Sequence, residues 1–378
     1  MISVLDLKAE YNALKTEVDA AIRRVLESGV FVGGPEVEMF ESELKAYLGV
    51  KHAVSVGSGT DALFIALRAL GVGPGDEVIA PAFTFIATIE AILHAGAKPV
   101  LADIDQETFN LDPAGLEGAV SPKTRAVLPV HLYGQPAPMS EISSFAAKHN
   151  LKVVEDAAQA IGARYCYPGS PRPNQLQADP GVAVGTLGHA AAFSFYPTKN
   201  LAAYGDGGLV ATNDDSLAEK ARMLAVHGAK TRYHHELAAG YTSRLDALQA
   251  AILRAKLPQL ESWNAKRRRI AKAYTESLSE LVFTPVVASY SLHTFHQYTI
   301  RTPERDRLIA HLKHKGVGSS IHYPLPVHLQ PAYTHLGSPG QFPHAEKAAR
   351  EVLSLPMHPF LTDEQAEYIG SAVRSFFG

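Results

Sequence analysis

The sequence predicts an α/β protein with a mostly parallel central sheet in a large domain, followed by a smaller α+β domain. Short, nearly continuous apolar runs alternate with helical stretches between about residues 52 and 230. Such runs are typical of strands buried on both faces of a sheet. The chain has 378 residues, more than one hydrophobic core usually holds. We therefore expect a large domain over 1–250 and a small domain over 251–378.

The elements of the large domain follow in chain order. Apolar residues recur at helical spacing over 6–28, and a second helix is expected over 36–48 after a Gly-Gly-Pro turn. Strands are expected at 53–56, 77–81, 98–104, 126–132, 152–157 and 191–195. Their alternation with helices predicts a doubly wound sheet.

Later segments break this rhythm. Residues 164–185 are rich in Pro, Gly and polar residues, which predicts a surface loop. A long helix over 244–279, kinked at Pro258, is expected to lead out of the first domain. The remainder predicts a strand at 296–302 and helices near 303–315, 344–353 and 362–376.

The bulk composition excludes several classes of protein. A net charge of −3 gives no reason to expect a nucleic-acid partner. No apolar run reaches the roughly 18 residues of a membrane span, and the N-terminus does not resemble a signal peptide. We expect a soluble cytoplasmic protein. No metal is expected, because neither the histidines at 227–235 nor His322 and His328 show a ligand spacing such as HExxH.

Four segments carry the residue types that a pyridoxal-phosphate (PLP) site requires. Lys199, in SFYPTKN, could bond the cofactor, and Asp156, at the end of a strand, could keep its ring nitrogen protonated. The segment SGTDAL, with Ser58, Gly59 and Thr60, begins a helix whose N-terminus could bind the phosphate.

Two further side chains could complete that site. Ser194 could add a hydroxyl to the phosphate, and Phe85 could cover the ring. Each residue also has a simpler explanation. Lys199 alone would be a surface lysine and Phe85 a core residue, while Asp156 and the SGT segment could be ordinary helix caps. The hypothesis depends on the joint pattern.

In that order, SGTDAL, PAFTFIAT, EDAAQAIGA, SFYPTKN and GDGG resemble the DegT/DnrJ/EryC1/StrS sugar aminotransferases. The resemblance extends from residue 29 to residue 362 and implies the aspartate-aminotransferase fold, fold type I of PLP enzymes. It implies that Lys199 forms the Schiff base, Asp156 pairs with the pyridine nitrogen and Gln159 lies beside the ring hydroxyl. It also implies that Ser58, Gly59, Thr60 and Ser194 bind phosphate and that Phe85 stacks on the ring.

The resemblance further implies a homodimer with shared active sites, in which residues 240–251 complete the neighbouring site. Thr242 stands where the family commonly has a phosphate-contacting Asn, so we expect that contact to be lost, bridged by water or supplied by Ser243. Arg244 corresponds to a residue near the substrate. The segment 321–333 resembles the one that carries substrate-contacting His322 and Tyr323.

A second departure from the family lies at 166–184. The loop is longer than in relatives, and His189 stands in GTLGH where Asp is usual. We expect this loop to border the cleft or the dimer contact.

The expected reaction is a two-step amino transfer. An amino acid, by resemblance L-glutamate, gives its amino group to the cofactor and leaves as 2-oxoglutarate. The group then passes to a nucleotide-linked, dTDP-type keto-6-deoxyhexose, with C3 preferred. Lys199 would act as the general base.

Alternatives to this reaction remain. They are a sugar dehydratase of the same family, which would carry His in place of Lys199, and a desulfurase that uses Cys166. A PLP-binding regulatory protein without turnover is the third.

Overall fold

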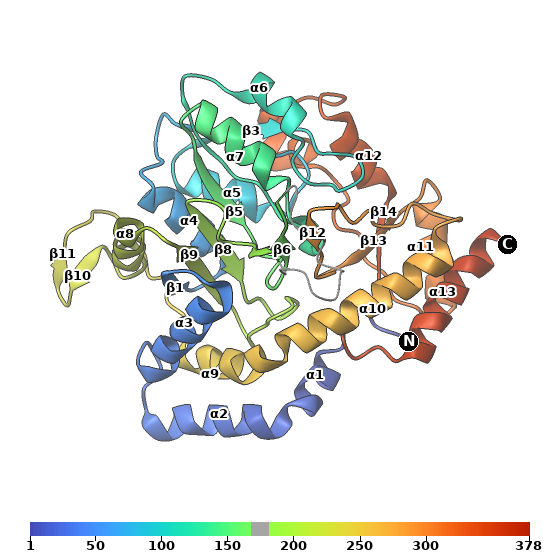
Figure 1. Cartoon of the computed structure of the whole chain (residues 1–378), viewed down its shortest axis with the longest axis horizontal. Coiled ribbons are helices and arrows are strands. Elements are labelled where there is room, and N and C mark those ends of the chain that lie inside the picture. Colours follow the sequence, from blue (N-terminus) through green and yellow to red (C-terminus); the bar gives the residue numbers. More distant parts are fainter. Residues whose placement is uncertain (168–180) are drawn as a thin grey trace.

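A seven-stranded sheet forms the centre of the protein in the computed structural model, which describes residues 1–167 and 181–378 (Figure 1). In spatial order its strands are β1 (His52–Val56), β9 (Gly208–Thr212), β8 (Ala190–Ser194), β5 (Lys152–Asp156), β4 (Thr124–Val127), β2 (Glu77–Pro81) and β3 (Lys98–Ala102). Neighbours from β8 to β3 are parallel, whereas β9 is antiparallel to both β8 and β1. The predicted mostly parallel sheet is confirmed.

All six strands predicted for the large domain are present. The expected strand over 126–132 ends earlier, at Val127, because Pro129 follows and residues Leu132–Gly134 form a 3-10 turn. Strand β9 was not predicted, because its short GLVAT run follows a pair of glycines that signals a turn.

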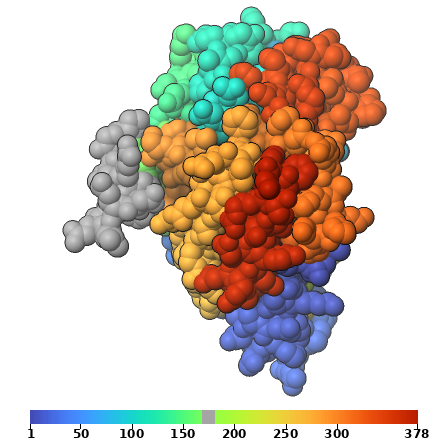
Figure 2. Space-filling model, turned by 90° about the vertical axis from the view of Figure 1, so that its right-hand side faces the viewer, coloured from blue at the N-terminus to red at the C-terminus, as the bar shows by residue number. Residues whose placement is uncertain are grey.

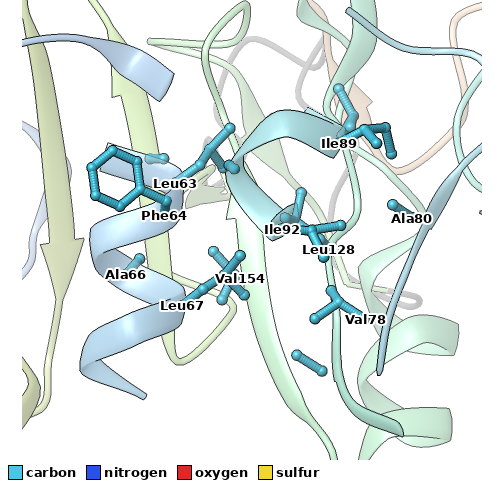
Figure 3. Close-up of a cluster of buried hydrophobic side chains, with 14 of the residues drawn as sticks. Leu63, Phe64, Ala66, Leu67, Val78, Ala80, Ile89, Ile92, Leu128 and Val154 are labelled. Carbon is cyan, nitrogen blue, oxygen red and sulfur yellow. The ribbon is translucent and has the colours of Figure 1, made fainter. Parts of the chain in front are cut away.

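Helices cover the sheet and seal it from water. They include α4 (Gly59–Ala69), α5 (Ala87–His94), α7 (Met139–Lys148) and α8 (Asp215–Ala225). Leu67 of α4 and Ile92 of α5 lie in one buried cluster with Leu128 and Val154 (Figure 3). Burying each such side chain contributes about 1.5–3 kcal/mol, which explains why the strands are apolar on both faces.

The N-terminal region contains two helices where one was predicted over 6–28. Helix α1 (Leu7–Ala13) ends at Leu14, whose φ of −125° and ψ of 19° are not helical, and α2 (Lys15–Ser28) begins after it. Helix α3 (Pro35–Leu48) confirms the expected second helix. Helix α2 packs on α9 (Ala247–Lys256), and the N-terminal helices form one end of the molecule (Figure 2).

The long bridging helix is interrupted where predicted. Helix α9 is followed by a 3-10 turn at Leu257–Gln259, which contains Pro258, and then by α10 (Leu260–Leu278). Proline has no N–H to continue the helical hydrogen bonds, which accounts for the break.

The C-terminal part is built around a two-stranded antiparallel sheet of β13 (Tyr298–Arg301) and β14 (Val352–Leu355). Helices α10, α11 (Arg305–His314) and α13 (Asp363–Phe377) bury a separate apolar cluster formed by residues between 270 and 373. Helix α13 lies on the surface beside α10 (Figure 2). Helix α12 (Pro343–Glu351) packs instead on the core of the large sheet. The domain boundary at residue 250 stays a prediction.

The segment expected to be a surface loop, 164–185, is partly a sheet. Strands β6 (Arg164–Tyr165) and β7 (Val182–Ala183) pair with each other, and β6 also pairs with β12 (Ser291–Leu292). The prediction was wrong at both ends of the segment, because strands this short form only by pairing with a strand elsewhere in the sequence. Residues 168–180 lie outside the described residues. A hairpin of β10 (Ala229–Thr231) and β11 (His234–His235) projects from the body (Figure 1).

Candidate active site

A cavity of about 400 Å³ lies at the carboxyl ends of the parallel strands, where open α/β sheets bind ligands. Strands β5 and β8 end at Asp156 and Ser194, and Phe85 follows β2. Among the side chains that line the cavity are the predicted residues Ser58, Gly59, Thr60, Phe85, Asp156, Gln159, Ser194, Lys199, His322 and Tyr323. Of the predicted site residues, only Thr242 and Arg244 lie elsewhere.

Asp156 is a buried carboxylate, 5% exposed, with neutral hydrogen-bond donors. Its Oδ2 accepts a 2.8 Å bond from the Thr88 hydroxyl, and its Oδ1 accepts from the N–H of Ala158. No side-chain cation in the described residues forms an ion pair with it. Burial therefore raises the pKa of Asp156, against the opposing effect of these hydrogen bonds. A bound cation at this point would relieve that cost.

Lys199 lies in a tight turn after β8, where its backbone N–H bonds the carbonyl of Tyr196. Its ammonium faces the cavity. Burial lowers the pKa of Lys199 from 10.5 to about 8, and the charge of Asp156 acts in the opposite direction. A substantial fraction of the amine is therefore neutral near physiological pH, as a nucleophile or base must be.

The N-terminus of α4 forms a narrow cradle. Ser58 caps the helix by accepting from the N–H of Asp61. A Cβ on Gly59 would lie 2.6 Å from the Cβ of Ser194, and one on Gly208 would lie 2.1 Å from the Ser58 carbonyl oxygen. Only glycine allows β9 and α4 to approach this closely. The free N–H groups and hydroxyls here are suited to a phosphate.

Gln159 joins two walls of the cavity. Its Oε1 accepts from the N–H of Tyr133, and its Nε2 donates to the hydroxyl oxygen of Tyr323 at 3.0 Å. The ring of Phe85 lies 5.8 Å from the ring of Tyr323 and is 53% exposed. Phe85 therefore presents an aromatic face at the mouth of the cavity and is not a core residue.

His322 reaches the cavity from the C-terminal part of the chain. Its Nδ1 lies 2.9 Å from the Ser354 hydroxyl, and its carbonyl accepts a hydrogen bond from the Tyr133 hydroxyl. Burial, followed by the charge of Lys199, lowers the pKa of His322 to about 4. The imidazole is therefore neutral at physiological pH.

Several residues at this site were not predicted. His296, Thr84 and Tyr196 also line the cavity, and Thr88 contacts Asp156 directly. The hydroxyls of Thr84 and Thr88 are 2.9 Å apart, but Thr84 lies before α5, which begins at Ala87, so no helical spacing in the sequence predicts this contact. His296 has no local signal, because it comes from the start of the C-terminal part.

Thr242 and Arg244 lie outside this cavity and are exposed. The Thr242 hydroxyl is 2.9 Å from Nε2 of His227. Ser243, considered as a substitute for the missing Asn, is 2% exposed, and its hydroxyl bonds the N–H of Gly57 and the carboxylate of Asp61. The hydroxyl of Ser243 therefore already makes hydrogen bonds to two groups of its own chain.

The alternative chemistries find little support in the geometry. Cys166 is 4% exposed and does not line the cavity, and the described loop residues 166–167 and 181–184 do not border it either. Nδ1 of His189 accepts a hydrogen bond from the backbone N–H of Val153. Within residues 1–167 and 181–378, no group of three or more His, Cys, Asp or Glu side chains could hold a metal ion.

Among the helices in the described part of the chain, none is both long enough and apolar enough to cross a bilayer.

The residues present fit PLP. A carboxylate that needs a cation, an amine of lowered pKa and a glycine-lined helix N-terminus face one cavity beside an exposed aromatic ring. The profile described as the DegT/DnrJ/EryC1/StrS aminotransferase family matches residues 12–374. The chain belongs to this family.

Similar proteins cover almost the whole chain. A "pleiotropic regulatory protein" of Geobacillus stearothermophilus is 50% identical over 100% of this chain and 98% of its own. A dTDP-3-amino-3,4,6-trideoxy-alpha-D-glucose transaminase of Streptomyces venezuelae is 48% identical over 99% of this chain and 96% of its own. Named transaminases among its relatives identify this family member as an aminotransferase.

Solved structures agree with the fold. The structure of S. venezuelae DesV in complex with a ketimine intermediate has a TM-score of 0.92 and 47% identity, and covers 99% of this chain and 98% of its own. NtdA of Bacillus subtilis, with bound cofactor PMP, has a TM-score of 0.87 and 33% identity, and covers 97% of this chain and 82% of its own. The predicted aspartate-aminotransferase-like fold is confirmed, and these relatives imply a pyridoxal cofactor.

Proposed function

We propose that this aminotransferase carries PLP on Lys199 and transfers an amino group from L-glutamate to a nucleotide-linked keto-6-deoxyhexose, with a dTDP sugar aminated at C3. The observation that carries the proposal is the placement of Lys199 and Asp156 on one cavity with the N-terminus of α4. The sugar class is supported by the 48% identity to the S. venezuelae transaminase, which acts on such a substrate by its name.

The chain's own groups would bind and orient the cofactor. Ser58, Gly59, Thr60 and Ser194 would hold the phosphate at the helix N-terminus, and Asp156 would accept a hydrogen bond from the ring nitrogen. When bound, PLP supplies an electron sink for the carbon that loses or gains a proton. Phe85 would exclude water from one face of the ring.

Lys199 would move the proton in both directions. Its amine, with a pKa lowered to about 8, can take a proton from the amino acid carbon and return one to the sugar carbon. The same group serves both half-reactions because the second reverses the first. Removing it would stop turnover from either side.

We also propose a homodimer whose sites are shared. Thr242 and Arg244 are exposed, and the Thr242 hydroxyl contacts His227 just before β10, so both residues are available to a partner. The surface also exposes the aromatic side chains of Phe31 (48%), Tyr196 (52%) and Tyr233 (82%). Exposed aromatic groups of this kind are common at subunit contacts.

A substrate panel tests the proposal. The protein is incubated with PLP, glutamate and several keto sugar nucleotides, and the release of 2-oxoglutarate is followed. We expect sugar-dependent release that Lys199→Ala abolishes, whereas Lys152→Ala at the exposed start of β5 retains it. Normal turnover by Lys199→Ala would refute the assignment. Cofactor binding without turnover on any sugar would favour the regulatory alternative, to which the name of the Geobacillus relative points.

A further inference from the structure

A buried hydrogen-bond network of two side-chain amides and one imidazole connects the turn at Lys199 to the wall of the cavity. Asn264 on α10, Asn200 and His296 are 0%, 5% and 6% exposed. Nδ2 of Asn200 lies 2.9 Å from Oδ1 of Asn264, and Oδ1 of Asn200 lies 3.1 Å from Nδ1 of His296. Asn200 directly follows Lys199, so this hydrogen-bond network lies beside the reactive amine.

Backbone carbonyls fix the direction of each hydrogen bond in this network. The Ile161 carbonyl can only accept, so the atom of Asn264 that faces it at 3.3 Å must be the amide nitrogen. The Thr294 carbonyl orients the amide nitrogen of Asn200 in the same way, at 3.4 Å. Oδ1 of Asn200 is then an acceptor, and Nδ1 of His296 must carry the hydrogen.

The other ring nitrogen of His296 is left with its lone pair. Among residues 1–167 and 181–378, none forms a hydrogen bond with Nε2, and this atom is not one of the polar atoms sealed without a partner. The position of His296 in the cavity wall and the accessibility of this atom together indicate that Nε2 faces the cavity. His322 differs, because its Nδ1 faces the Ser354 hydroxyl, which can either donate or accept.

The imidazole of His296 stays neutral. Burial lowers the pKa of His296 well below its ordinary value, and the charges of Lys199 and Arg267, with that of His322 wherever it is protonated, act in the same direction. These groups come from the turn after β8, from α10 and from the segment after α11. A neutral ring with hydrogen on Nδ1 offers only an acceptor to the cavity.

We propose that Nε2 of His296 accepts a hydrogen bond from a hydroxyl of the sugar and so selects the amino acceptor. This inference rests on the proposed function. A sugar hydroxyl can donate such a bond, whereas the side-chain carboxylate of glutamate carries no hydrogen at neutral pH. An acceptor here therefore favours the sugar over the amino donor in a cavity that both must enter.

Two half-reactions, each followed by the absorbance of the bound cofactor, test the role. In His296→Phe, which retains a ring but no acceptor, we expect kcat/KM of the sugar half-reaction to fall about three- to tenfold, with a smaller fall for glutamate. Equal losses in both halves, or no loss in either, overturn the inference but leave the proposed function standing. Wild-type protein that reacts with glutamate but with no keto sugar overturns both.

Asn200→Asp gives a signature that a purely structural role would not. The new carboxylate would raise the pKa of His296, and the protonated ring would present a donor at Nε2 instead of an acceptor. We expect the sugar half-reaction, measured relative to the glutamate half-reaction, which shares the base Lys199, to be weak at a pH of about 6 and to recover as the ring loses its proton towards a pH of about 8. A loss that does not change with pH overturns the inference.

The tautomer can be measured without activity. Histidine-labelled holoenzyme is studied by nitrogen NMR, with the His296 signal assigned by its absence in His296→Phe or, if that variant does not fold, in His296→Gln. We expect a neutral ring protonated at Nδ1 in the wild type at a pH of about 6. A ring protonated at Nε2, or a charged ring, would overturn the inference even if His296→Phe failed to fold.

Discussion

The Thr88 hydroxyl donates a 2.8 Å hydrogen bond to Oδ2 of Asp156. Thr88 lies in the first turn of α5, so this bond links the helix after Phe85 to the end of β5. The bond stabilises the carboxylate form of a group whose burial favours the neutral form.

Replacing Thr88 should weaken cofactor binding. Thr88→Val retains the shape but removes the donor, so the pKa of Asp156 should rise further and the carboxylate should hold the ring nitrogen less well. We expect PLP affinity to fall about five- to tenfold in an absorbance titration. Thr84→Val, whose hydroxyl contacts Thr88 and not Asp156, is the control and should have a smaller effect. Equal affinities for Thr88→Val and the wild type would contradict this role of the bond.

The apo protein should be stabilised by removing the charge of Lys199. Because folding lowers the pKa of Lys199 from 10.5 to about 8, the favourable contribution of the neutral amine is present above 10.5 and is lost as the pH falls through 8. At pH near 7, Lys199→Met should therefore increase the free energy of unfolding by ~1–2 kcal/mol, allowing for solvent at the cavity wall.

Chemical denaturation across the pH range measures this effect. The difference between Lys199→Met and wild type should shrink as the pH rises above 8. Lys152→Met, at an exposed position, should show no such trend. A difference that is constant with pH would indicate a packing effect instead.

The glycine at the start of β9 should not tolerate a methyl group. In Gly208→Ala the Cβ would lie 2.1 Å from the Ser58 carbonyl oxygen, so β9 and the N-terminus of α4 must separate. We expect a loss of about 2–4 kcal/mol in the free energy of unfolding, together with weaker PLP binding. Gly118→Ala, where the new Cβ would meet nothing within 4 Å, is the matched control. Normal cofactor affinity in Gly208→Ala would rule out this cradle as the phosphate site.

Shared sites predict complementation between two inactive variants. Lys199→Ala and Arg244→Ala should each have little activity as homodimers. After co-refolding in equal amounts, half of the dimers are mixed, and each has one site with both native residues, so activity should return to about a quarter of wild type. Failure of the mixture to regain activity, with mixed dimers shown by mass spectrometry, would place Arg244 in the site of its own chain or outside any site.

Local patterns in the sequence were enough to predict much of the fold. The six predicted strands are continuous apolar runs, and Pro258 interrupts the bridging helix by its own chemistry. Strands β6 and β7 were missed because each has only two residues and is defined by its pairing, and the break at Leu14 was missed because the apolar spacing continues through it. A cytoplasmic location stays a prediction.

Some residues of the candidate site could likewise be predicted from local sequence patterns, and others could not. Asp156, Ser194 and Phe85 could be predicted because each lies at or just after the end of a strand, and such ends meet at one edge of the sheet. His296 could not, since only the folded chain brings it beside Asn200, 96 residues away in the sequence. The roles of Thr242 and Arg244 in the site of a neighbouring subunit stay predictions.

The covalent attachment point of the cofactor tests the central claim most directly. The protein incubated with PLP is reduced with borohydride and digested, and the modified peptide is sequenced by mass spectrometry. We expect the added pyridoxyl group on Lys199, with Lys199→Arg unmodified under the same conditions. A group on a different lysine, or no modification of protein that is folded and saturated with PLP, would contradict the account.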